Sequence, residues 1–197
     1  MKIVNYPHPS LRHKAVPVKA LDQRIRDHVR EMLDLMYEGK GLGLAGPQVA
    51  LPYQIFVMNL VPEERELPPA ERKNERVYIN PVISDPKGWI EGEEGCLSFP
   101  GLYKKVRRAK TITFQAYDQN GQLVTGTASE LEARVWQHEV DHLQGVLFID
   151  KMGALAKLSV RGDLKHFERE FRQALERGEI QTEDEIQKEL QGLEVLA

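Results

Sequence analysis

The residues best suited to chemistry are two histidines four positions apart, His138 and His142, with Glu139 between them. Residues at this spacing share one face of an α-helix, so both imidazoles can bind one metal ion. Glu139 points slightly around the helix, where it can reach a water on the metal without becoming a ligand. The pattern therefore predicts a hydrolytic metal site with Glu139 as its general base.

The phase of this helix argues against solvent-exposed histidines. Leu131 and Val135 precede His138 and His142 at helical spacing, so the histidines continue the apolar face. A metal ligand or a buried, hydrogen-bonded histidine explains that placement, and a solvated histidine does not.

A catalytic metal site needs a third protein ligand. The metzincin pattern places a histidine six residues after the second one, and here Phe148 stands there, which excludes it. A thermolysin-like site would use a later glutamate, and Glu168 or Glu170 is available, although both stand among basic residues. The remaining candidate is Cys96, because a thiolate binds Zn²⁺ or Fe²⁺ strongly and the preceding Gly95 lets the backbone approach closely.

Three separated blocks resemble, in order and spacing, the signature motifs of the peptide deformylase family, and the similarity covers about residues 1–175. The blocks are residues 41–48 (GLGLAGPQ), 94–98 (EGCLS) and 137–145 (QHEVDHLQG). The resemblance implies an α+β fold and a hydrolase that removes the formyl group from the formyl-methionine of new polypeptides. It also implies that Cys96 is the third ligand.

The resemblance further implies a single divalent cation, held by Cys96, His138 and His142. Such a mixed set of thiolate and imidazole ligands tolerates several metals, so geometry alone does not choose among them. By the resemblance Fe²⁺ is the working ion, and Zn²⁺, Ni²⁺ or Co²⁺ can replace it. Gln137 and Asp141 are expected to hydrogen-bond around the site rather than bind the metal.

The resemblance also assigns roles around the substrate. The side-chain amide of Gln48 and the backbone N–H of Leu97 would stabilise the oxyanion, and the peptide would lie extended between two backbone segments. The predicted substrate-binding residues are Leu42, Gly43, Glu94, Gly95, Leu131 and Val135. For Leu131 and Val135, packing in the core is an equally good explanation.

The sequence departs from the family pattern in three places. Gly46 stands where the family usually has a second alanine, a loss of one methyl group that should not disturb Gln48. Residues 61–76 form a longer insertion than expected, and residues 178–197 extend past the usual C-terminal helix. We therefore predict a catalytic domain at 1–177 with an exposed insertion, followed by a helical extension at 178–197. The sequence does not predict which partner molecules the insertion and the extension contact.

The elements that must position these residues follow from periodicity and turn residues. Segregated helices and hairpin-connected strands predict an α+β domain. Two capping boxes are expected, Ser129 with Glu132 and Thr182 with Glu185. Pro81 is expected to break a strand into short pieces at 77–80 and 82–84. The remaining predictions are helices at 22–39, 129–143 and 163–178, a short terminal helix, and strands at 54–60, 111–117 and 122–128.

Composition limits the classes of protein. The chain has 197 residues, 41% of them hydrophobic, and a net charge of −3, which predicts one globular domain and excludes a basic nucleic-acid binder. The basic run at 104–110 is expected to be a solvated strand edge. No apolar stretch is long enough to span a membrane, the N-terminus lacks a secretory signal, and the lone cysteine suits a reducing cytoplasm.

Two rival functions remain. One is an ordinary metallopeptidase, which would need a carboxylate as its third ligand. The other is a catalytically silent relative that binds nascent chains or ribosomes. The resemblance also suggests that the helix at 163–178 docks on the ribosome.

Overall fold

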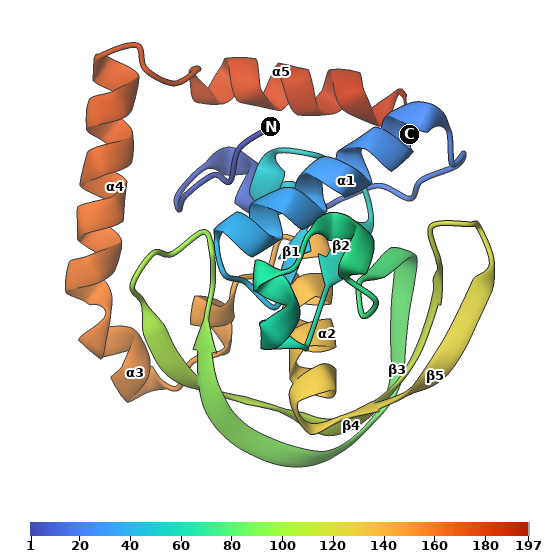
Figure 1. Cartoon of the computed structure of the whole chain (residues 1–197). Coiled ribbons are helices and arrows are strands. Elements are labelled where there is room, and N and C mark those ends of the chain that lie inside the picture. Colours follow the sequence, from blue (N-terminus) through green and yellow to red (C-terminus); the bar gives the residue numbers. More distant parts are fainter. Residues whose placement is uncertain (197) are drawn as a thin grey trace.

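The computed structural model describes residues 1–196, which form an α+β fold around one five-stranded antiparallel sheet (Figure 1). Each strand pairs with the next one in the sequence, so the sheet is a meander. The strands are β1 (Gly43–Ala45), β2 (Ile55–Met58), β3 (Arg76–Gly95), β4 (Tyr103–Tyr117) and β5 (Leu123–Ser129). The predicted fold class is confirmed.

Helix α2 (Glu130–Leu143), which carries both histidines, lies inside the curl of the sheet (Figure 1). Its fully buried Trp136 stacks on Phe114 with ring centroids 4.3 Å apart and fixes the helix against the sheet. The expected capping box at its start is wrong. Ser129 ends β5 and Glu130 takes a left-handed φ of 53°, and in this turn the Ser129 side chain caps no backbone N–H.

Helix α1 (Gln23–Glu38) forms where its apolar period predicted. The Asp22 side chain caps it by accepting a hydrogen bond from the Ile25 N–H at 2.9 Å, and Gly39 follows its end. Its buried face packs with β1 and β2 in one core cluster. This packing places residues 41–48 beside α2.

Strand β3 is the main correction to the predicted elements. The expected break at Pro81 is wrong, because β3 runs unbroken over 20 residues. Pro81 instead falls where the pairing with β4 shifts register, between Ile79 and Val82; a residue without an N–H is tolerated at such a bulge. The long strand ends at Gly95 and so delivers Cys96 to the site.

The insertion at 61–76 is an ordered loop with two short 3-10 turns, η3 (Pro62–Glu66) and η4 (Pro69–Glu71), and no hairpin. The buried Glu64 carboxylate organises it. Glu64 accepts hydrogen bonds from the Asn59 side chain at 2.9 Å and from the Asn74 backbone N–H at 3.0 Å. A loop was predicted here, but its buried charge was not.

Three helices end the chain: α3 (Ala154–Ser159), which was not predicted, α4 (Arg161–Glu176) and α5 (Glu183–Glu194). Helix α4 stands at one side of the molecule, and α5 crosses over the N-terminal segment (Figure 1). The capping box of Thr182 with Glu185 is confirmed by hydrogen bonds in both directions, at 2.8 and 3.3 Å. None of the helices in the described part of the chain has the length and apolar character that crossing a membrane requires.

Candidate metal centre and active site

The structure brings Cys96, His138 and His142 together. Cys96 directly follows β3, the two histidines lie on α2, and the three ligand atoms all lie within 4.8 Å of one another. The Cys96 Sγ is 3.3 Å from the His142 Nε2. Both histidines are buried, with 9% and 1% of their surface exposed, as the helix phase predicted.

The chemistry of this group fits a divalent transition metal. One thiolate and two imidazoles suit Zn²⁺, Fe²⁺, Co²⁺ or Ni²⁺, and three ligands leave a position open for catalysis. Glu139 Oε2 and His142 Nδ1 are two of the four buried side-chain polar atoms that have no hydrogen-bond partner within residues 1–196. A buried carboxylate oxygen without a partner, beside three converging ligands, is expected where a reacting group binds.

Glu94, the last buried residue of β3, orients His138. Its Oε2 lies 3.0 Å from the His138 Nδ1, which leaves the Nε2 free to bind a metal. Two arginines surround the same carboxylate. Arg108 donates one hydrogen bond to each Glu94 oxygen, both at 2.9 Å, and Arg134 Nη1 donates to the Glu94 Oε1 at 2.6 Å. Arg108 also pairs with Asp141. Both Glu94 oxygens are thus occupied, and its predicted contact with substrate stays a prediction.

Sequence reasoning missed the role of both arginines. Arg108 was expected to be solvated with the rest of the basic run, but only 3% of its surface is exposed, so this prediction is wrong. The alternation of residues along β4 indicated that Arg108 is buried, since Arg108 lies on the same face of the strand as the buried Val106. Arg134 on α2 gave no sequence signal, although it also donates to the backbone carbonyls of Val106 and Ile90.

These contacts set the protonation of the site. Burial lowers the pKa of His138, but hydrogen bonds to Cys96 and Glu94 outweigh that effect and raise the pKa to about 10. A cation that binds His138 must therefore displace a proton. Burial raises the pKa of Glu139 to about 7, which suits a general base at neutral pH.

Residues 41–48 form the opposite side of the site. The Gln48 Oε1 accepts a hydrogen bond from the Ala45 N–H at 2.8 Å, which directs the Nε2 toward the Cys96 Sγ, 3.3 Å away. The backbone at Gly43 passes directly over Glu139. A methyl group at Gly43 would lie 2.5 Å from the Glu139 Oε1, so the site needs glycine here.

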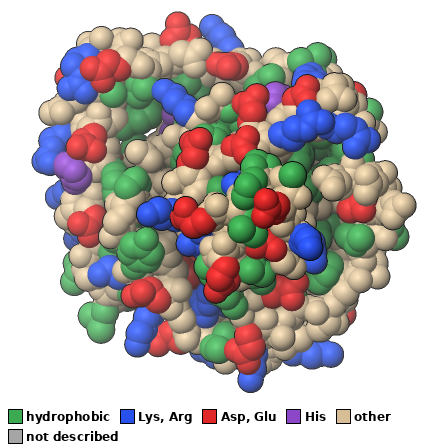
Figure 2. All heavy atoms as spheres, viewed as in Figure 1, with side chains coloured by type: hydrophobic (Ala, Val, Ile, Leu, Met, Phe, Trp, Pro, Cys, Tyr) green, Lys and Arg blue, Asp and Glu red, His purple; other side chains and the backbone are tan. Residues whose placement is uncertain are grey.

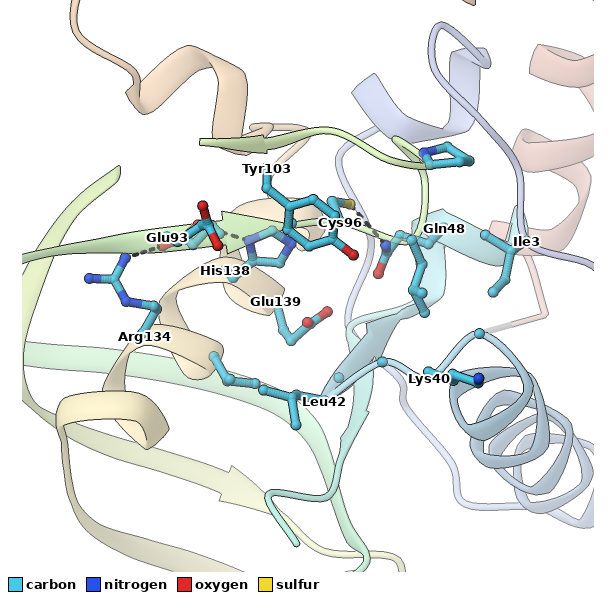
Figure 3. A pocket seen from close by; sticks show the side chains of 18 of the residues that line it. Ile3, Lys40, Leu42, Gln48, Glu93, Cys96, Tyr103, Arg134, His138 and Glu139 are labelled. Carbon is cyan, nitrogen blue, oxygen red and sulfur yellow. Dashed lines mark hydrogen bonds and ion pairs between the residues drawn. The ribbon is translucent and has the colours of Figure 1, made fainter. Parts of the chain in front are cut away.

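Cys96, His138 and Glu139 open onto a cavity of about 610 Å³, and His142 lies behind them (Figure 3). Leu131 is 49% exposed, so the alternative that it packs in the core is wrong. The sequence missed several other lining residues, among them Ile3, Asn5 and Tyr103. The predicted residues that line the cavity are Leu42, Gly43, Gln48, Glu94, Gly95, Cys96, Leu97, Leu131, Val135, His138 and Glu139.

Comparison with known proteins agrees with this arrangement. The sequence model of the family described as "Polypeptide deformylase" matches residues 1–158. The chain belongs to the peptide deformylase family. The peptide deformylase of Rhodopirellula baltica is 39% identical over 186 residues, which cover 93% of this chain and 88% of that protein.

Solved structures show the same peptide deformylase fold. The crystal structure of the Plasmodium falciparum peptide deformylase has a TM-score of 0.81 and 41% identity, covering 87% of this chain and 97% of that one. Peptide deformylase 1B of Arabidopsis thaliana, solved with an inhibitor, has a TM-score of 0.79 and 39% identity over 88% of this chain and 93% of that one. The family resemblance read from the three motif blocks is therefore confirmed.

The thermolysin-like alternative for the third ligand is wrong in this peptide deformylase. Glu168 and Glu170 both lie on α4, outside the cluster of ligand atoms. Glu168 accepts a hydrogen bond from the Tyr6 hydroxyl at 3.2 Å, and Glu170 lies 3.3 Å from the His166 Nε2. Helices α4 and α5 also lie beyond the residues that the peptide deformylase model matches.

Proposed function

We propose that this chain hydrolyses the N-formyl group from the N-terminal formyl-methionine of newly synthesised polypeptides and releases formate. The observation that carries this proposal is the convergence of Cys96, His138 and His142 beside the buried Glu139, at the wall of a peptide-sized cavity. Membership of the peptide deformylase family supports the same reaction.

Cys96, His138 and His142 would hold a divalent cation, which would supply Lewis acidity toward the formyl carbonyl and lower the pKa of water. Glu139 accepts the proton of the attacking water and passes it to the departing amine. Burial raises the pKa of Glu139 above its usual range, which favours a carboxyl group that can both accept and release a proton.

Gln48 and Leu97 stabilise the negative oxygen that forms during attack. The Gln48 Nε2 is already oriented, since the Ala45 N–H holds its Oε1. The backbone N–H of Leu97 donates to no other described residue and is available to the oxyanion. Both groups are donors fixed before the reaction, so they need no reorganisation at the transition state.

The peptide lies between the backbones of Gly43 and Gly95 and adds as a strand to both. The methionine side chain enters the apolar part of the cavity, whose wall includes Leu42, Leu131 and Val135. A Cβ at Gly43 would meet Glu139 and one at Gly95 would meet the Tyr103 ring, so each glycine lets a side chain that lines the cavity lie against the backbone.

We assign Fe²⁺ as the working ion and the cytoplasm as the compartment, where a lone thiol stays reduced. A thiolate on iron is exposed to oxygen, and Cys96 has no partner cysteine to form a recoverable disulfide. Enzyme reconstituted with Fe²⁺ should lose activity in air, while Ni²⁺ or Co²⁺ enzyme stays active and Zn²⁺ enzyme is stable but slower. Iron enzyme as stable in air as nickel enzyme would remove the iron assignment.

Ribosome docking is an expectation for α4, whose exposed face carries Lys165, Arg169 and Arg172. Co-sedimentation with ribosomes, with and without substitution of these three residues by glutamate, measures it. If binding does not depend on salt and survives the substitutions, this face of α4 is not the ribosome-binding surface.

The proposed reaction is tested by formate release from formyl-Met-Ala-Ser, with and without a chelator. Chelator-sensitive formate release at the N-terminus supports deformylation. Cleavage of internal peptide bonds would indicate a metallopeptidase, and tight peptide binding without any cleavage would indicate a catalytically silent relative.

A further inference from the structure

A second cavity of about 480 Å³ lies between the N-terminal segment (residues 2–8) and helix α4. Ile3 and Asn5 line both this cavity and the active-site cavity, so the two adjoin across the N-terminal segment. Figure 2 shows this face of the molecule hollowed between α4 and the centre. We call the second cavity the C-terminal groove.

One wall of the C-terminal groove is a backbone edge with two N–H groups unpaired within residues 1–196, while its Asn5 carbonyl accepts a hydrogen bond from the His8 N–H at 2.9 Å. The N–H groups of Val4 and Tyr6 point into the protein, where they donate to Gln48 O and Ser98 O at 2.9 Å. Backbone groups of successive residues in an extended chain point to opposite sides. Ile3 and Asn5 therefore direct theirs outward, and neither N–H donates to another described residue. An edge of this kind pairs with an extended peptide.

The opposite wall is apolar and comes from the C-terminal part of the chain. Phe167, Phe171 and Ala174 project from α4, and Ile180 follows from the link to α5. No residue of α4 is fully buried, so this apolar face is only partly covered by the rest of the protein. Charged side chains stand at the rim of the groove: Lys2, Glu170 and Glu179.

We propose that the C-terminal groove binds downstream residues of the same polypeptide whose formylated N-terminus lies in the active-site cavity. The inference rests on the proposed function, because it needs a peptide in the first cavity. The two cavities adjoin at Ile3 and Asn5, so a peptide that leaves the first passes next to the second, and this selects the occupant. The backbone edge holds the main chain, and the aromatic wall takes an apolar side chain. The enzyme thus favours polypeptides over very short peptides.

The test uses formyl peptides of three, five, seven and nine residues that share the sequence formyl-Met-Ala-Ser and carry leucines beyond it. We expect kcat/KM to rise about tenfold once the peptide reaches the groove, mostly through a lower KM. Ala174→Trp fills the groove and should remove this gain. Gln173→Trp adds the same bulk on the exposed side of α4 and should keep it. A rate independent of length, or a gain that survives Ala174→Trp, would overturn the proposal.

A second measurement does not depend on turnover. A nine-residue formyl peptide with a photoreactive phenylalanine at position seven is bound to the Glu139→Gln variant and cross-linked. Cross-links to residues 2–8 or to α4 support the groove, and cross-links confined to other surfaces refute it. If the groove is labelled but the unsubstituted enzyme fails to deformylate the tripeptide, the proposed function fails while the groove stands.

Discussion

Around the metal ligands, charged groups are buried and paired with one another, whereas around α4 they stand at the surface. Glu94, Arg108 and Arg134 are nearly inaccessible and hold His138 through a continuous set of hydrogen bonds. Helix α4 is attached by a hydrogen bond from Tyr6 to Glu168 and by aromatic contacts of Phe167 and Phe171.

This difference indicates that the metal site needs a fixed geometry, whereas the region around α4 does not. Buried charges fix geometry because each misplaced group would lose its partner in a low-dielectric interior. Surface contacts of aromatic rings allow changes without such a penalty. We therefore expect substitutions at the site to have large effects on activity or stability, and substitutions along α4 to have small ones.

The largest expected effect comes from Glu139→Gln. The amide keeps the shape of the side chain but cannot accept a proton, so turnover should fall by several orders of magnitude, more than the 10²–10⁴ of simple proton transfer. Metal content, measured by elemental analysis, should stay at one equivalent. A variant that keeps more than a tenth of the parent rate would remove Glu139 from the general-base role.

Arg108→Leu should give the next largest effect, on stability. It removes the cation that Glu94 and Asp141 share and leaves Arg134 as the only arginine on Glu94. Breaking a buried pair typically costs about 3–5 kcal/mol, and because Arg134 remains, we expect a loss of about 3 kcal/mol. Urea denaturation measures the free energy of unfolding. The matched control is Arg107→Leu, because Arg107 is exposed on the same strand, and this variant should change stability by less than about 1 kcal/mol. Equal losses in the two variants would contradict the role of the buried pair.

Gly43→Ala should reduce activity with little loss of stability. The added methyl group would lie 2.5 Å from the Glu139 Oε1 and must displace either the carboxylate or the backbone strand. A misplacement of this size costs about 100-fold in kcat/KM. Gly153→Ala, where the added methyl meets nothing within 4 Å, serves as the control. An unchanged rate in Gly43→Ala would show that Glu139 tolerates movement.

The smallest expected effect lies at the α4 side of the molecule. Burial lowers the pKa of His8, which faces Phe171 of α4, from 6.5 to about 4. Between these values the unfolded chain binds a proton that the folded protein does not, so stability falls as the pH drops from 6.5 to 4. Because His8 is only partly buried, we expect a loss of about 1–2 kcal/mol.

The measurement for His8 is the free energy of unfolding at pH 7 and at pH 4.5, in the parent and in His8→Gln. The difference between the two pH values should be smaller in the variant, since glutamine does not titrate. Parallel pH curves for the two proteins would assign the acid sensitivity to other groups.

Local patterns in the sequence predicted the parts of the molecule that depend on neighbouring residues. The period of α2 placed His138 and His142 on one buried face, and three motif blocks identified Cys96 as their companion. The cap at Asp22 was predictable for the same reason, since its partner Ile25 is three residues away.

Contacts between distant residues were not predictable from local patterns. Arg108 was assigned to solvent because its partners Glu94 and Asp141 lie 14 and 33 residues away. Pro81 was taken to break a strand because a bulge depends on the register of the neighbouring strand, which periodicity does not show. Glu64 was placed in an exposed loop for a similar reason, since its partners gather only when the loop folds.

The order of the strands has a consequence for how the protein is made. Every strand pairs with the one synthesised just before it, so the sheet can assemble step by step as the chain emerges from the ribosome. The metal ligands do not share this order, because Cys96 is made more than 40 residues before His138 and must wait for α2 to enter the curl of the sheet. The enzyme therefore cannot take up its metal gradually during synthesis. Metal loading can begin only after α2, and with it all five strands of the sheet, has been synthesised.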